Sequence, residues 1–524
     1  MNKKIKLLLI SSEMTPFAQT GGLAEAIAGL SKALKKFDLD IRVALPFYRS
    51  IKKMHLNFNT IAKQIKIPMG PSTLKGDIIL FKTDENIPIY FIKRDRFFDR
   101  SGIYGDRRGD YHDNAERFIF LSKVIFKLCQ IISFIPDVLH CHDWQTGLIP
   151  VYHKEPSIYN INYFSNTVSI FTIHNIAYQG IFKKDKFIFT DLPEDIFSQN
   201  GLEFWGKINF MKGGILFSDI VSTVSPTYAK EIQTKEYGFG LEELIKSRAS
   251  ELCGILNGVD YSNWDPKNDP FLASNYSSKD LRGKEICKKD LINEMELNKE
   301  MINQPLVGMI SRLASQKGID ILLKALPGLI KMGANFVFLG KGEKGYQRDL
   351  KMIAKRYPGR IGLRFSYDPT LAHKIEAGSD ILVMPSLYEP CGLAQIYAMR
   401  YGTIPVVRAV GGLEDTVENY IPQKGKGTGF KFKEYNAKAF LSKLKEAIVL
   451  FKNKEGTDII DRKEITGSLF EIVEQVMDFV RLYTKVAYKF TGKPRRENVY
   501  EYPFDAIREA IINSVMHKIV FMHD

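Results

Sequence analysis

Residues 305–340 read PLVGMISRLASQKGIDILLKALPGLIKMGANFVFLG, and this stretch indicates the fold class. A short apolar run at 305–310 is followed by a loop with a glycine at 311–318, and a second apolar run covers 336–339. Between the loop and the second run, apolar residues recur at helical spacing over 319–331. Short apolar runs are typical of buried strands, and a three-to-four-residue period is typical of a helix. The stretch therefore predicts a strand, a helix and a second strand, the unit from which parallel sheets are built.

The same order of elements recurs along much of the chain. Near the start, a strand is expected at 5–11, a glycine turn at 20–22 and a helix at 23–34. Further strands are expected at 361–365, 381–384 and 404–407, with helices between them. Strands that alternate with helices predict an α/β fold with parallel sheets covered on both faces.

Two such blocks meet near the turn Asn257-Gly258-Val259-Asp260. We therefore expect two Rossmann-like domains, at 1–255 and 256–455, with a ligand cleft between them. Residues 456–524 do not continue the alternation and are expected to form an atypical, mainly helical tail.

Composition excludes several classes of protein. The 524 residues are 45% apolar and 26% charged, which is typical of a globular chain. No apolar run approaches the ~20 residues of a membrane span, and the apolar start is too short for a secretory signal, so a cytoplasmic protein is expected. The five cysteines show no CxxC spacing, which argues against a disulfide framework or a zinc site. The net charge of +14 is spread along the chain, so nucleic acid is an unlikely partner and phosphate-bearing substrates are favoured.

The first candidate motif is Gln19-Thr20-Gly21-Gly22-Leu23, at the expected strand-to-helix junction. Paired glycines let backbone N–H groups approach an anion, and the positive end of the helix dipole favours negative charge. The alternative is a tight turn that only packs the first helix.

The second candidate motif combines HCHDW, which begins at His140, with TIHNIAYQG, which contains His174. Each run follows an expected strand, and ligands bind at the carboxyl ends of parallel strands. We therefore expect Asp143 and His174 to line one site. Metal binding by His140, His142, Asp143 and His174 is a weaker alternative, since imidazole and carboxylate are common ligands.

The third and fourth motifs are SRLASQKG, with Arg312 and Lys317, and EPCGL, with Glu389. Two cations five residues apart can grip a diphosphate, and a carboxylate can bind sugar hydroxyls. The alternatives are a solvated basic loop for the cations and a helix-capping acid for Glu389.

Eight segments, in order and spread over most of the chain, resemble one family: the bacterial glycogen synthases and plant starch synthases. They read TGGLAE, HCHDW, TIHNIAYQG, INFMKGGILFSDIVSTVSPTYAKEI, YGFGLEELI, GILNGVD, SRLASQKG and EPCGLAQIYAMRYGTIPVV. The resemblance implies a GT-B fold and transfer of glucose from ADP-glucose, or from UDP-glucose, to the non-reducing end of an α-1,4-glucan such as glycogen, with retention of configuration.

The resemblance also implies roles for individual residues, with neither a metal nor a cofactor. Arg312 and Lys317 would neutralise the diphosphate leaving group. Glu389 would hold the glucose hydroxyls, and His174 would lie near the sugar. Further substrate-binding residues implied by the resemblance are Gln19, Gly21, Gly22, Asp143, Asn257, Tyr367, Cys391, Gly392 and Leu393.

Three residues depart from the family pattern. Gln19 stands where the family usually has a lysine that reaches the nucleotide phosphates, Glu25 stands where aspartate is usual, and Ala394 stands where threonine is common. Loss of the lysine charge is expected to weaken donor binding. A catalytically impaired glucan- or nucleotide-binding homologue is therefore the alternative function.

Residues 461–517 resemble part of a different family, the AlbA-type transcriptional regulators with a GHKL-like ATP-binding region. Glu509 and Asn513 fit the ExxxN pattern of that family. This resemblance implies an incomplete fragment of a second protein and leaves a DNA-binding regulator as a third reading.

Overall fold

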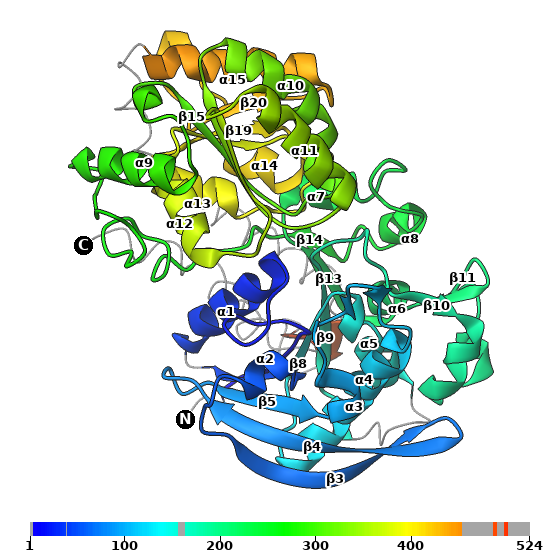
Figure 1. The fold of residues 1–524 in the computed structure, drawn as a ribbon. Coiled ribbons are helices and arrows are strands. Elements are labelled where there is room, and N and C mark those ends of the chain that lie inside the picture. The colour runs from blue at the N-terminus through cyan, green and yellow to red at the C-terminus, as the bar shows by residue number, and fades with distance from the viewer. Residues whose placement is uncertain (1–3, 38, 156–162, 453–485, 490–496, 501–524) are drawn as a thin grey trace. The chain divides into compact units, whose positions relative to one another are not determined.

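The computed structural model describes residues 4–37, 39–155 and 163–452, together with two short strands near the C-terminus (Figure 1). These residues form two compact units. Unit 1 holds the described residues up to 224, residues 229–258 and the two short strands near the C-terminus, and unit 2 holds 225–228 together with 259–452.

Unit 1 is built on a nine-stranded sheet. In spatial order its strands are β14 (Leu252–Gly254), β13 (Ile220–Thr223), β9 (Val168–Ile173), β8 (Val138–His142), β1 (Lys6–Ile10), β2 (Asp40–Pro46), β5 (Pro88–Lys93), β4 (Ser72–Lys82) and β3 (Asn59–Met69). The strands from β14 to β5 are parallel, and β4 and β3 add an antiparallel edge. Figure 1 shows β3 and β4 as long, curved strands at that edge.

Helices and two small sheets complete unit 1. The helices are α1 (Gly22–Lys35), α2 (Arg49–Lys52), α3 (Asp95–Phe98), α4 (Asn114–Ile131), α5 (Leu148–Lys154), α6 (Phe210–Phe217) and α8 (Glu242–Ser247), with 3-10 turns η1 (Trp144–Thr146), η3 (Lys184–Thr190) and η4 (Glu194–Ile196). The small sheets are β10 (Ile181–Lys183), β12 (Lys207–Asn209) and β11 (Glu203–Phe204), and the pair β6 (Gly105–Asp106) and β7 (Gly109–Asp110). Helix α7 (Pro226–Glu231) has residues 226–228 in unit 2 and the rest in unit 1.

Unit 2 is built on a six-stranded sheet that is parallel throughout. In spatial order its strands are β17 (Ile361–Arg364), β16 (Asn335–Leu339), β15 (Leu306–Ile310), β18 (Ile381–Met384), β19 (Ile404–Arg408) and β20 (Phe430–Phe432). Its helices are α9 (Arg282–Glu294), α10 (Ile319–Lys331), α11 (Lys344–Arg356), α12 (Pro369–Gly378), α13 (Ala394–Arg400), α14 (Gly411–Thr416) and α15 (Ala437–Lys452), with 3-10 turns η5 (Lys299–Met301), η6 (Ser315–Lys317) and η7 (Pro422–Lys424). The strands and helices expected here from the sequence are confirmed.

Alternate residues of the unit 2 strands enter two separate cores. On β18, Ile381 and Val383 pack in one core, and Leu382 and Met384 pack in the other. Helices α10 and α15 supply the first core, and α9 and α12 supply the second. A strand buried on both faces needs apolar side chains at every position, which explains its continuous apolar run.

The described part of the tail is a two-stranded antiparallel hairpin of β21 (Val486–Lys489) and β22 (Glu497–Tyr500). The rest of 461–517, on which the AlbA-type resemblance depends, lies outside the described residues. Within the described part of the chain, no helix combines the length and apolar character needed to cross a bilayer.

Candidate active site

Each of the two large sheets has one point where the order of its strands reverses, and several of the predicted site residues follow the strands at these points. In unit 1, the chain runs from β1 to β2 on one side, and β8 lies on the other side of β1. In unit 2, β15 has β16 on one side and β18 on the other. Loops that leave adjacent strands in opposite directions open a crevice at their carboxyl ends, where ligands of open α/β sheets bind. The topology therefore gives each unit one candidate binding edge.

Asp143 lies directly after β8 and joins the ends of two strands of unit 1. Its backbone is in the left-handed region, with φ 58°. Its Oδ1 accepts the backbone N–H of His174 at 2.7 Å and that of Asn175 at 3.2 Å. The carboxyl is buried, which raises the pKa of Asp143 to about 7 in spite of these two N–H donors. A strained backbone at a buried acid is a feature of functional sites.

Three imidazoles lie beside Asp143. The ring of His140 lies 4.1 Å from that of His142, and His142 Nδ1 lies 3.1 Å from His174 Nε2. Burial lowers the pKa of His140 to about 4 and that of His174 to about 3, and it holds the pKa of His142 well below its ordinary value. At pH 7 all three rings are neutral, so this edge of unit 1 carries no imidazolium charge.

This geometry does not favour the metal alternative. Asp143 Oδ1 accepts two backbone N–H groups, and His140 Nε2 is hydrogen-bonded to the Thr172 hydroxyl at 2.7 Å. In the part of the chain that the structure describes, no group of three His, Cys, Asp or Glu side chains is arranged to hold a metal ion.

The glycine turn after β1 is organised by a buried acid that sequence reasoning missed. Glu13 accepts the Thr20 hydroxyl at 2.6 Å and the Tyr104 hydroxyl at 2.6 Å, and burial raises the pKa of Glu13. Gly21, in extended backbone, is the N-cap residue just before α1, and a side chain added to Gly21 would meet no described atom within 4 Å. The turn is therefore open on this side, as an anion site requires.

Two of the residues that depart from the family pattern contact each other. Gln19 Nε2 donates to Glu25 Oε1 at 3.0 Å, and Gln19 Oε1 accepts from the Thr15 hydroxyl at 3.3 Å. Gln19 is thus held by its own loop and by the first turn of α1.

In unit 2, Lys317 and Glu389 form one ion pair. The distance from Lys317 Nζ to Glu389 Oε2 is 2.5 Å, and the side chains are only 16% and 8% exposed. The same carboxylate oxygen accepts the Ser386 hydroxyl at 3.1 Å. Low exposure keeps water from screening the pair. Lys317 and Glu389 are 72 residues apart in the sequence and meet because β15 and β18 are neighbours.

The loop after β15 is fixed to the loop after β18 through Gln316. Its backbone oxygen accepts the N–H of Leu387 at 2.8 Å, and its side chain donates to the Tyr388 oxygen at 3.2 Å. Gly318 has φ 71°, and a Cβ there would lie 2.0 Å from the Pro385 oxygen. Only glycine fits this close approach. Arg312 joins the group by a 3.3 Å hydrogen bond from Nη2 to Gln316 Oε1.

The segment EPCGL runs between this ion pair and α13. Because α13 begins at Ala394 without a side-chain cap, the alternative that Glu389 caps this helix is wrong. The Glu389 backbone oxygen accepts the N–H of Gly412, and Cys391 is buried. Gly392 and Leu393 are half-buried.

Two predicted residues lie on loops that follow other strands. Tyr367 follows β17 and is 71% exposed. Asn257 is half-buried in the segment after β14. Their roles in substrate binding stay predictions.

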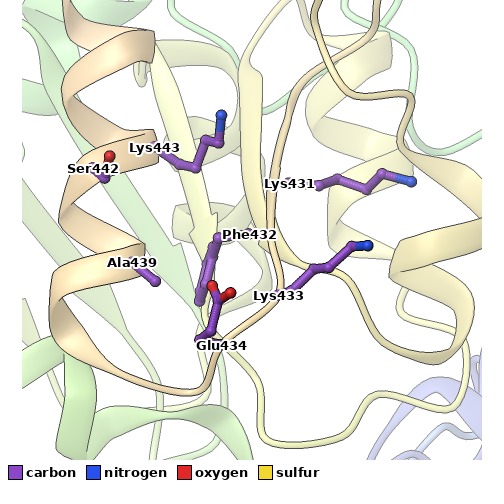
Figure 2. A pocket seen from close by; sticks show the side chains of 7 residues that line it. All are labelled: Lys431, Phe432, Lys433, Glu434, Ala439, Ser442 and Lys443. Carbon is purple, nitrogen blue, oxygen red and sulfur yellow. The ribbon is translucent and has the colours of Figure 1, made fainter.

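A hollow of about 260 Å³ lies elsewhere on unit 2, between the end of β20 and the start of α15 (Figure 2). Three lysines line the hollow, but Lys431 forms an ion pair with Glu414, and Lys443 forms an ion pair with Glu446. None of the predicted site residues lines this hollow. The hollow is lined by Lys431, Phe432, Lys433, Glu434, Ala439, Ser442 and Lys443.

The chain has two Rossmann-type units, each with polar groups at its reversal point, and comparison with known proteins shows that its class is a glycosyltransferase of GT-B fold. Residues 6–247 match the starch synthase catalytic domain family, and residues 293–455 match the group 1 glycosyl transferases. A glycogen synthase of Koribacter versatilis is 42% identical over 480 residues, which cover 91% of this chain and 97% of the relative. A glycogen synthase of Thermosipho africanus is 42% identical over 494 residues, which cover 93% of this chain and 100% of that relative.

A solved structure gives the same result. The catalytic domain of starch synthase IV from Arabidopsis thaliana, bound to ADP and acarbose, matches with a TM-score of 0.81 and 30% identity, over 91% of this chain and 99% of that chain. The chain belongs to the glycogen and starch synthase family. The expected fold and enzyme class are thus confirmed.

Proposed function

We propose that the chain transfers glucose from ADP-glucose to the non-reducing end of an α-1,4-glucan, with retention at the anomeric carbon. The observation that carries the proposal is the buried Lys317–Glu389 pair at the reversal point of unit 2. ADP is favoured as the leaving group because the starch synthase IV structure holds ADP.

The cations stabilise the leaving group. An ammonium has three N–H donors, and one donor of Lys317 meets Glu389. Lys317 can therefore bridge the carboxylate and a phosphate oxygen of the donor, and Arg312 adds a planar guanidinium from the same loop. Negative charge that develops on the departing diphosphate is stabilised by groups that are already in place, so little reorganisation is needed.

Unit 1 supplies the groups assigned to the sugar side. His174 is neutral, because burial lowers its pKa to about 3, so it does not repel positive charge that develops on the anomeric carbon. Asp143 positions His174 by accepting its backbone N–H. We assign Gln19, Gly21 and Gly22 to the phosphate and acceptor side, and Asn257, Cys391, Gly392 and Leu393 to substrate binding. Tyr367 is assigned to the nucleotide base.

Two finer assignments accompany the proposal. A cytoplasmic location fits the five cysteines, all of which carry free thiols. The AlbA-type resemblance of residues 461–517 stays a prediction about the tail.

The test is release of nucleoside diphosphate from ADP-glucose and from UDP-glucose, with and without glycogen. We expect glycogen-dependent release from ADP-glucose, reduced at least about 100-fold in Lys317→Ala and Glu389→Ala. No release from either donor, with nucleotide binding retained, would instead support the impaired homologue. That alternative is favoured by one observation, the engagement of Gln19 with Glu25.

A further inference from the structure

The hairpin between β11 and β12 contains an unusual residue in its turn. The two-residue loop is Trp205-Gly206, with φ 55° and 74°, and Phe204 pairs with Lys207 across it. The Gly206 N–H donates to Glu203 Oε1 at 2.7 Å. Two positive φ values are typical of the I′ turn, whose first position favours asparagine, aspartate or glycine. A tryptophan in left-handed backbone is an outlier that turn propensity does not explain.

Packing does not explain Trp205 either. Its side chain is 83% exposed, the highest value among the large apolar residues in the described part of the chain, where Tyr367 follows at 71%. Its ring contacts the Phe204 ring edge-on, with centroids 6.2 Å apart. A strained backbone that presents a large ring to solvent points to a ligand for that ring.

A second exposed ring lies next to this turn. Phe239 also has left-handed backbone, with φ 51°, and is 41% exposed. A Cβ on the following Gly240 would lie 3.1 Å from Phe204 Cζ, so the two loops are adjacent. The Phe239 backbone oxygen accepts from Gln179 Nε2 at 2.9 Å. Phe204, Trp205 and Phe239 lie on these two adjacent loops, and we call them the aromatic patch.

The aromatic patch belongs to a sheet that continues directly from a site segment. Strand β10 begins at Ile181, seven residues after His174, and pairs with β12, which pairs with β11. Seven extended residues span at most about 25 Å, so β10 begins within that distance of His174. Figure 1 shows β10 and β11 at the periphery of unit 1.

We propose that the aromatic patch binds the α-glucan polymer at a site separate from the reacting end, with Trp205 stacked on the apolar face of a glucose ring. The inference rests on the proposed function, which supplies the polymer. A folded protein partner fits less well, because a stable interface buries about 800 Å² on each partner, and three side chains, two of them partly covered, offer far less. A pyranose ring is similar in size to one indole, so a single aromatic side chain is enough to stack on one glucose unit.

The test compares Trp205→Asn with Trp205→Phe in the full chain. Asparagine suits the turn better than tryptophan, so a purely structural Trp205 predicts an unchanged or higher melting temperature and no other effect. Our proposal predicts that Trp205→Asn also raises KM for glycogen about fivefold to tenfold, while kcat and the KM for maltotriose stay unchanged. Trp205→Phe keeps a ring and should recover most of the affinity. An unchanged KM for glycogen in Trp205→Asn would overturn the proposal.

A binding measurement separates failure of the patch from failure of the proposed function. Retardation of the full chain in a native gel that contains glycogen needs no donor and no turnover. Retardation that Trp205→Asn reduces supports the patch even if no glucose is transferred. Equal retardation of both proteins, with Trp205→Asn changing only the sedimentation coefficient, would assign the patch to self-association and refute glucan binding.

Discussion

Removal of one partner of the Lys317–Glu389 pair should destabilise unit 2 more than removal of both. Because both side chains are less than one-fifth exposed, the loss of one leaves the other charge buried without compensation. Breaking such a pair costs about 3 kcal/mol or more. In Lys317→Met the carboxylate keeps the Ser386 hydroxyl, which offsets about 1 kcal/mol. We therefore expect Lys317→Met to lose about 2–3 kcal/mol, and Lys317→Met/Glu389→Gln to lie within about 1 kcal/mol of the wild type.

The assay is urea unfolding followed by tryptophan fluorescence, in which Trp264 reports on unit 2. The matched control is the exposed pair Arg282–Asp280, whose side chains are 89% and 48% exposed, and whose removal should leave the unfolding midpoint unchanged. Activity should be lost in Lys317→Met, in the single variant Glu389→Gln and in the double variant, since recovered stability restores neither the cation nor the carboxylate. Strictly additive losses, with the double variant the least stable, would refute the reasoning.

Further predictions concern single residues and the tail. Burial raises the pKa of Asp143 to about 7, above its unfolded value, so its contribution to stability falls as pH rises from about 4 through 7. Asp143→Asn should therefore gain about 1 kcal/mol of stability relative to wild type between pH 6 and pH 8, measured by urea unfolding; a constant difference would contradict the assigned burial. Gly318→Ala should lower the free energy of unfolding by about 2 kcal/mol or more, measured by calorimetric melting. The control is Gly425→Ala, which is also at positive φ but whose added Cβ would meet nothing within 4 Å, and it should lose about 1 kcal/mol. Equal losses in the two variants would refute the close contact between Gly318 and Pro385. Gln19→Lys should lower KM for ADP-glucose about fivefold by adding a cation at the glycine turn, and an unchanged KM would show that this position does not reach the phosphates. If residues 461–517 act as a regulator, the full chain should bind duplex DNA with an affinity that falls steeply as the salt concentration rises, measured by fluorescence anisotropy. If a chain truncated at residue 455 binds DNA equally well, residues 461–517 are not the DNA-binding segment.

The sequence predicts unit 2 well because the inner strands β15, β16, β18 and β19 are buried on both faces. A strand such as 381–384 has to be apolar throughout, and the helices around it have a clear period. The antiparallel edge of unit 1 was not predicted, because β3 and β4 mix exposed and buried positions and give no continuous apolar run. Their pairing depends on contacts that no local pattern records.

The candidate site was predicted in its residue types but not in its contacts. Both Lys317 and Glu389 follow expected strands, yet only the neighbourhood of β15 and β18 shows that they touch. Asp143 accepts the backbone N–H of His174, which follows β9, and this contact is also possible only because β8 and β9 are neighbours in the sheet. Glu13 was missed altogether, although one signal was present: an acid three residues after the end of a buried strand at the reversal point.

The central claim is tested most directly by the bond that the enzyme makes. ADP-glucose is mixed with maltotriose and the full chain, and the new anomeric proton is followed by NMR together with ADP release. The account predicts an α-1,4 anomeric signal that grows in equal amount to the ADP released. ADP release with free glucose as the only product, or a new signal of β configuration, would contradict it.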